Sequence, residues 1–185
     1  TPTVADNKTE LGAASSTGAF TTSMTSLLAY TTYYVRAYVT NSAGTVYGDE
    51  VSFTTDSAAP TVTTQAVTSV STTTATGNGN ITYLGGPNPT QHGVCWGTSE
   101  NPTTSNDCTT DGAASATGAF TSSITGLTPG TTYHVRAYAT NTVSTVYGSD
   151  VSFTAYKAPT VTTQAVSSVA ITTATGNGNI TYLGV

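Results

Sequence analysis

The chain repeats itself at an offset of 99 or 100 residues. The 26 residues from Pro60 to Gly85 recur from Pro159 to Gly184 with three substitutions. Three other segments recur in the same way, and they begin at Gly12, Thr31 and Val46 and again at Gly112, Thr131 and Val146. A period of this length corresponds to one small domain, because the units of solenoid proteins are only about 20 to 50 residues long.

The repeat divides the chain into three parts. Residues 60–155 form a complete unit, residues 1–56 match the later part of a unit, and residues 159–185 match its beginning. Placed end to end, the two terminal parts would make one further unit that lacks only the counterpart of Gly86 to Glu100. We therefore expect one complete domain flanked by two partial domains.

The residues predict strands throughout the unit. Along residues 131–140, Tyr133, Val135 and Ala137 share one face while His134 and Arg136 share the other, which is typical of a half-buried strand. Thr makes up about a quarter of the chain, and β-branched side chains suit a pleated sheet. No segment shows a helical period. Six or seven short strands in about a hundred residues predict an all-β fold, an antiparallel β-sandwich.

One segment carries a family resemblance. The sequence LTPGTTYHVRAYATN, from Leu127 to Asn141, resembles strand F of fibronectin type III-like domains and the turn before it. The resemblance implies that the hydroxyl of Tyr133, and that of Tyr33 in the other copy, closes the corner between two strands. With HGVCWGTSENPT and VYGSDVSFT, the unit is similar to tandem fibronectin type III-like or immunoglobulin-like repeats of bacterial secreted and cell-surface proteins. This resemblance specifies the fold much more closely than the function.

One predicted strand has an unusually small inner face. Ala75, Gly77, Gly79 and Ile81 share that face, and glycine there removes packing, so we expect a large side chain to lie against it. We predict that the indole of Trp96, the only tryptophan, covers the two glycines. The alternative is that Trp96 is an exposed platform for sugar rings.

The chain contains two cysteines, Cys95 and Cys108. An even count in an all-β chain of secreted type favours a disulfide over free thiols, and closing so short a loop contributes about 3 kcal/mol. A zinc site is not expected, because His92 and His134 have no partner at ligand spacing. The residue that matches Cys108 in the first part is Lys8, so that part would lack the bridge.

The sequence lacks the residue constellations that catalysis requires. It has no nucleophile elbow, no metal-spaced cluster and no phosphate-binding glycine loop before a helix. We expect His92 and His134 to be ordinary surface residues, and we expect no enzymatic activity, no cofactor and no metal. The alternative is a calcium site among the loop acids, but Asp49, Glu50, Asp107, Asp111 and Asp150 show no recognisable ligand pattern.

Charge and hydropathy exclude two classes of partner. Nine acidic and four scattered basic residues give a net charge of −5, which provides no basic surface for nucleic acid. No apolar run approaches the eighteen residues of a membrane-spanning helix, and no signal peptide opens the chain, so we expect a mature soluble product or a segment of a longer protein.

Three sequons, at Asn7, Asn80 and Asn179, are candidates for glycosylation. So many threonines make three sequons close to chance expectation, but a surface with few charges needs another source of hydration.

The last part of the chain carries apolar side chains without a sheet to cover them. They are Val161, Val166, Val169, Ile171, Ile180 and Leu183. Full burial of each such side chain is worth about 1.5 to 3 kcal/mol. The matching sheet is encoded in residues 1–56, so we expect residues 159–185 of one molecule to complete residues 1–56 of the next. A head-to-tail contact of this kind does not close and builds a fibre.

The sequence thus predicts a non-enzymatic, extracellular structural protein, a subunit of a bacterial filament or surface appendage whose partner is a further copy of itself. One alternative is a segment of a long covalent repeat array such as an adhesin stalk. Another is a carbohydrate-binding accessory module of a secreted enzyme, which would present aromatic residues on one face, with candidates Tyr34, Tyr38, Tyr138 and Tyr147.

Overall fold

The computed structural model describes residues 1–184, and every regular element in that range is a β-strand. The chain falls into two units, one made of Thr1–Ala58 with Gly85–Pro87 and the other of Ala59–Leu84 with the residues from Asn88 onward. The first is called the amino-terminal unit below. Within the second, the strands β5 to β12 are called the central sandwich, and the strands β13 and β14 the carboxyl-terminal hairpin.

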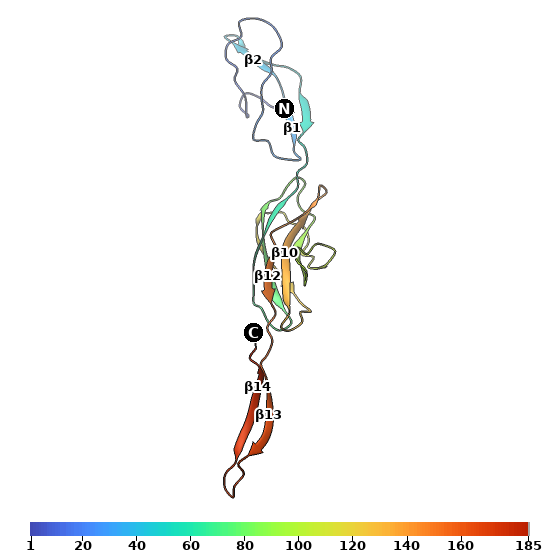
Figure 1. Cartoon of the computed structure of the whole chain (residues 1–185). Helices are drawn as coiled ribbons and strands as arrows, with labels where there is room; N and C mark the ends of the chain where they lie inside the picture. Colours follow the sequence, from blue (N-terminus) through green and yellow to red (C-terminus); the bar gives the residue numbers. More distant parts are fainter. Residues whose placement is uncertain (185) are drawn as a thin grey trace. The chain divides into compact units, whose positions relative to one another are not determined.

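The central sandwich consists of two antiparallel sheets. One sheet has the order β5-β6-β9, with bounds Thr61–Thr68, Ala75–Tyr83 and Gly118–Ile124. The other has the order β11-β10-β7-β8. Its strand β12 also pairs with β10, and Figure 1 shows these two strands side by side. The bounds of β7, β8, β10, β11 and β12 are Gln91–Gly97, Asp107–Cys108, Thr132–Thr140, Thr145–Tyr147 and Val151–Thr154. Both β5 and β6 pack against β10.

The hydrophobic core lies between these two sheets. Of the residues that the structure describes, all the buried apolar side chains fall between Pro60 and Ala155. Along β10, Tyr133, Val135 and Ala137 are buried, as their alternation predicts. Tyr138 departs from the alternation, because it is also buried and its hydroxyl donates to the Thr109 carbonyl at 2.7 Å. The expected all-β sandwich fold is confirmed.

Two local features of the family resemblance are present. The Tyr133 hydroxyl accepts a hydrogen bond from the Thr128 amide at 3.0 Å, and the Tyr33 hydroxyl accepts one from the Leu28 amide at 2.9 Å. Both tyrosines therefore close the corner before their strand, although the turn before Tyr33 has lost the proline and glycine of the other copy. Cys95 and Cys108 form the predicted disulfide across β7 and β8.

The amino-terminal unit reproduces only part of the central sandwich. Its strands β1 (Thr32–Val35) and β4 (Val51–Thr54) pair as β10 and β12 do, and β2 (Tyr38–Asn41) and β3 (Gly44–Tyr47) pair as β10 and β11 do. Local contacts are also preserved, since the guanidinium of Arg36 lies 4.7 Å from the Tyr47 ring centre, as that of Arg136 does from Tyr147.

The carboxyl-terminal hairpin repeats the first two strands of the central sandwich. Its strands β13 (Thr160–Ser167) and β14 (Thr175–Tyr182) pair antiparallel (Figure 1). Their register matches that of β5 and β6, including both irregularities. The 26-residue repeat therefore encodes the same hairpin with and without a second sheet against it.

Candidate interaction surfaces

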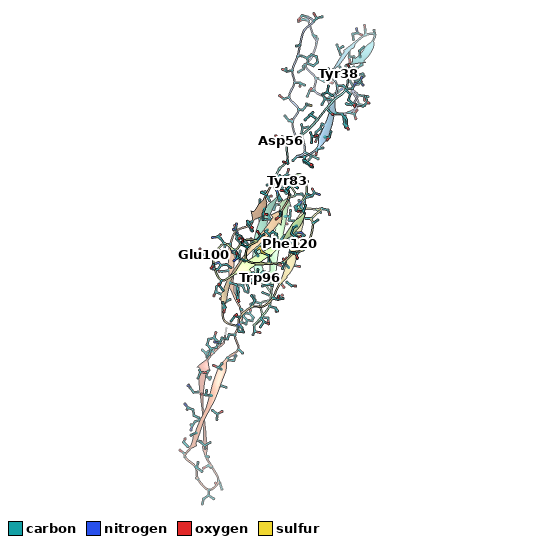
Figure 2. The ribbon with its side chains drawn as sticks, turned by 90° about the vertical axis from the view of Figure 1, so that its right-hand side faces the viewer. Tyr38, Asp56, Tyr83, Trp96, Glu100 and Phe120 are labelled. Carbon is teal, nitrogen blue, oxygen red and sulfur yellow. A yellow bond between two sulfur atoms is a disulfide. The ribbon has the colours of Figure 1, made fainter. Side chains whose placement is uncertain are left out.

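The carboxyl-terminal hairpin exposes an apolar face that its counterpart buries. Val62 in β5 is 8% exposed and Ile81 in β6 is 3% exposed, whereas their counterparts Val161 and Ile180 are 71% and 63% exposed. All six apolar residues predicted to need a covering sheet are exposed, namely Val161, Val166, Val169, Ile171, Ile180 and Leu183. Figure 2 shows the side chains of this hairpin standing along its two strands without a second layer of strands over them.

The glycines of the two hairpins differ in the same sense. A Cβ at Gly77 would lie 2.8 Å from Val94 Cγ2, and one at Gly79 would lie 2.7 Å from Phe120 Cε1 and 2.8 Å from Ala137 Cβ. The counterpart Gly176 has no such atom within 4 Å, and Gly178 has only a backbone oxygen of the paired strand at 3.5 Å. The small face of β14 is therefore a vacant surface of the same shape.

The prediction that Trp96 covers this glycine face is not what the structure shows. The atoms nearest to Gly77 and Gly79 belong to Val94, Ile124, Phe120 and Ala137. Trp96 is 9% exposed and belongs to the core cluster, as a core marker should. Trp96 stands opposite Val135 in β10, whereas Val94, two residues earlier in β7, stands opposite Ala137.

The amino-terminal unit leaves open the position that β5 fills in the central sandwich. In the central sandwich a Cβ at Gly148 would meet the backbone of β5, with the Thr63 carbonyl carbon at 2.9 Å. At the counterpart Gly48 the nearest atoms are the carbonyl oxygen and Cβ of Ala37, at 3.8 and 3.9 Å, which are ordinary contacts. Among the described residues, the strands of the amino-terminal unit are β1 to β4, and none of them corresponds to β5.

A hydrogen bond links the two sheets of the central sandwich at this place. The Ala137 amide in β10 donates to Thr64 Oγ1 in β5 at 3.0 Å. The corresponding groups are the Ala37 amide in the amino-terminal unit and Thr163 Oγ1 in the hairpin. Sequence reasoning missed Gly48, Ala37 and Thr163, although their match to Gly148, Ala137 and Thr64 in the repeat could have identified them.

The amino-terminal unit also exposes large apolar side chains. They are Leu11, Phe20, Met24, Leu28, Tyr30, Tyr34, Val39, Val46 and Val51. Val39 and Val46 stand opposite each other in β2 and β3, so these two form one exposed apolar pair.

Of the four tyrosines proposed for sugar binding, Tyr34 is 59% exposed, and the other three make hydrogen bonds through their hydroxyls. The Tyr138 hydroxyl is bonded to Thr109, and the Tyr147 hydroxyl accepts a hydrogen bond from the Thr104 amide at 3.0 Å. A cleft of about 430 Å³ lies beside Trp96 and is lined by Gly97, Ser105, Asn106 and Asp107 among others. The buried indole presents little surface there for stacking on a sugar ring.

Both histidines have structural partners. His92 Nδ1 lies 2.8 Å from the Gly112 carbonyl oxygen, and its ring meets the Phe120 ring edge-on at 4.8 Å. His134 Nδ1 lies 3.0 Å from Asp150, which also accepts a hydrogen bond from the Asn101 amide. In the described part of the chain, no group of three or more His, Cys, Asp or Glu side chains could hold a metal ion.

One ion pair of the amino-terminal unit shifts the pKa values of both of its side chains. Lys8 Nζ donates to Glu10 Oε1 at 2.9 Å, and this hydrogen bond lowers the pKa of Glu10 and raises the pKa of Lys8. Since both side chains are in water, we expect the pair to add little to stability at physiological salt.

The three sequons lie in different surroundings. Asn7 is exposed in a turn, Asn80 is half-buried in β6, and Asn179 is exposed in β14. No helix capable of crossing a membrane occurs among residues 1–184.

Comparison with known proteins supplies structural neighbours only. No protein-family model and no curated protein matches the chain. One similar structure is the sensor domain of the anti-sigma factor RsgI4 of Pseudobacteroides cellulosolvens, at 15% identity and TM-score 0.36, with 52% of this chain and 93% of that chain covered. Another is the FN1–FN3 region of chicken CNTN1, at 14% identity and TM-score 0.40, with 70% of this chain and 44% of that chain covered. Such distant likeness carries no argument about function.

Proposed function

We propose that the chain is a non-enzymatic structural protein that assembles head to tail with copies of itself. The carboxyl-terminal hairpin of one copy packs its apolar face on the strands β1 to β4 of the next copy and completes a second sandwich there. The single observation that carries this proposal is the central sandwich, in which the same two sequence segments already pack together.

The vacancies of the two parts are complementary. Val161 and Ile180 of the hairpin are exposed where Val62 and Ile81 are buried. Gly48 leaves open the space that β5 fills beside Gly148. Because each fully buried Val or Ile contributes about 1.5 to 3 kcal/mol, covering this face supplies the free energy for association, from which ordering and association costs are subtracted.

The contact joins two different surfaces of the molecule. A heterologous contact does not close on two copies, so it propagates and builds a filament. The open strand edges of the hairpin and of the amino-terminal unit are templates for pairing until a neighbour covers them.

A second candidate is a long covalent array of such repeats. In the central sandwich β7 pairs with β10 over seven residues, from His134 with Gly97 to Thr140 with Gln91. A donated hairpin brings no counterpart of β7 to the amino-terminal unit. A continuous chain that supplies the hairpin together with the strand after it would fill both positions.

The extracellular location and the bacterial cell-surface setting belong to this proposal. The disulfide between Cys95 and Cys108 favours an oxidising compartment. Glycosylation at Asn7, Asn80 and Asn179 remains a prediction, as does any binding of surface glycans.

The experiment compares substitutions on the two faces of the hairpin. Val161→Asp and Ile180→Asp place a charge on the apolar face, and Thr162→Asp is the matched control on the opposite face of β13. In sedimentation velocity, we expect the unmodified chain and the control to form polymers, and both apolar-face variants to remain at the 18.7 kDa mass of one chain.

Two outcomes contradict the proposal. Monomers of the unmodified chain at all attainable concentrations would remove self-assembly. Native fibres that resist boiling in detergent and show a mass many times 18.7 kDa would instead establish the covalent array.

A further inference from the structure

A segment of the amino-terminal unit has the sequence of a strand without the structure of one. Residues 18–24 are identical to β9 (Gly118–Ile124) at five of seven positions. In β9 these residues pair with β6 from Gly118 opposite Ile81 to Ile124 opposite Ala75. Residues 18–24 form no strand, and their Phe20 and Met24 side chains are exposed.

The hairpin has the strand edge that this segment lacks. In the central sandwich β6 is the middle strand of its sheet, between β5 and β9. Its counterpart β14 pairs with β13 alone among the described residues. One edge of β14 therefore has free backbone donors and acceptors, which is the feature that recruits an additional strand.

We propose that residues 18–24 fold into a strand on the free edge of β14 when the hairpin of a neighbouring copy docks. This inference rests on the proposed head-to-tail assembly and names a second contact within it. The donated hairpin then becomes enclosed, with β14 as the middle strand of a three-stranded sheet built from two molecules.

The repeat specifies the register. By the pairing of β6 with β9, Met24 stands opposite Ala174, Phe20 opposite Gly178 and Gly18 opposite Ile180. The ring of Phe120 lies directly over Gly79, so Phe20 has a preformed place over Gly178. Ile124 is 0% exposed in the finished sandwich, whereas Met24 is 46% exposed, so docking also buries Met24.

The segment follows the hairpin rather than preceding it. Residues 18–24 have no strand to pair with until β14 arrives, and a single unpaired strand is unstable in water. Ordering of this segment is therefore coupled to assembly. Until a hairpin docks, residues 18–24 add no strand to the amino-terminal unit.

The test uses cysteine pairs in the full chain. Ala119 and Asn80 are register partners on the outer face of β9 and β6. The double variant Ala19→Cys with Asn179→Cys places thiols at the corresponding positions of two adjoining molecules. The control, Ala19→Cys with Thr175→Cys, keeps the same face but is four residues out of register, about 13 Å, which is too far for a disulfide.

The results distinguish the strand formed by residues 18–24 from the head-to-tail assembly on which it rests. After mild oxidation, non-reducing denaturing gels of the matched pair should show a ladder of linked chains, with peptide mapping of a bond between positions 19 and 179, and the control should stay monomeric on the same gel. Polymers in sedimentation with no ladder from the matched pair would overturn this inference and leave the head-to-tail assembly intact. Absence of polymers, or a bond formed only within single chains, would overturn both.

Discussion

Gly77 and Gly176 have the same neighbours in sequence and different neighbours in space. A Cβ at Gly77 would lie 2.8 and 3.1 Å from the two methyl carbons of Val94, whereas nothing lies within 4 Å of one at Gly176. Neither glycine is required for a left-handed turn, since neither has a positive φ. The close approach of the opposite sheet is therefore the physical reason for glycine at Gly77, and it identifies the face of β14 that the proposed assembly would cover.

This difference predicts opposite effects for the same substitution. Gly77→Val should overpack the central sandwich and lower its free energy of unfolding by about 1 to 3 kcal/mol. Gly176→Val should leave that transition unchanged in the monomer and weaken polymerisation instead. Urea unfolding of dilute protein and sedimentation of concentrated protein separate the two effects. Equal destabilisation of the monomer by both variants would contradict the vacant face of β14.

The disulfide makes a second prediction at this scale. Removing it with Cys95→Ala and Cys108→Ala together should lower the free energy of unfolding of the central sandwich by about 3 kcal/mol, because the loop is no longer closed in the unfolded chain. Reduction of the unmodified protein is the control and should shift the urea midpoint to the same extent. Unchanged unfolding after reduction would show that the bridge contributes nothing.

Single residues differ in how far sequence predicts them. The corner tyrosines Tyr33 and Tyr133 were predictable, because a hydrogen bond to an amide five residues earlier depends on local chain geometry. The side chains that cover the Gly77 and Gly79 face of β6 were not predictable, because they depend on the register between β7 and β10. A slide of two residues exchanges Trp96 for Val94 as the side chain opposite Ala137.

Strand elements form here wherever both partners lie nearby in the chain. The pairs β1–β4, β2–β3 and β13–β14 keep the registers of the complete sandwich although their second sheet is absent. Residues 18–24 do not, since the strand they need belongs to a different copy of the repeat. The match to β9 predicts that residues 18–24 can form a strand, and by the proposed assembly they do so when β14 of a neighbouring copy docks.

The arginine of each repeat tests this local encoding. Arg136 Nε donates to the Gly148 carbonyl at 2.8 Å and its guanidinium lies over Tyr147, and Arg36 makes the same two contacts with Gly48 and Tyr47. Arg136→Ala should lower the free energy of unfolding of the central sandwich by about 1 to 2 kcal/mol. Arg36→Ala should leave this transition unchanged, as urea unfolding followed by Trp96 fluorescence can measure. A shift of the Trp96 transition by Arg36→Ala would show that the amino-terminal unit supports the central sandwich.

At the scale of the whole molecule, the chain contains one finished sandwich and two incomplete parts of the same repeat. The order of later part, complete unit and first part was predictable from the repeat alone, because the offset stays at 99 or 100 residues throughout. What covers the exposed faces of the carboxyl-terminal hairpin and of the amino-terminal unit was not predictable, since a repeat can be completed by a second copy or by a longer chain. The central claim is that a second copy completes it.

Complementation between two blocked variants tests this claim most directly. Gly48→Val blocks the docking surface of the amino-terminal unit, because β13 of the neighbour must approach this position as β5 approaches Gly148. Within its own molecule, Gly48 has room for the larger side chain. Gly178→Val blocks the hairpin in the same way, because Phe20 and Ala37 of the neighbour must approach it as Phe120 and Ala137 approach Gly79.

Each variant alone should remain a monomer of 18.7 kDa, because each lacks one of the two surfaces. Mixed in equal amounts, they should form a one-to-one complex of twice that mass, in which the intact hairpin of the Gly48→Val chain docks on the intact amino-terminal unit of the Gly178→Val chain. Growth should stop there, because the two surfaces that remain are both blocked. Sedimentation equilibrium of the mixture gives the answer. A mixture that stays monomeric while the unmodified chain polymerises, or variants that polymerise on their own, would contradict the account.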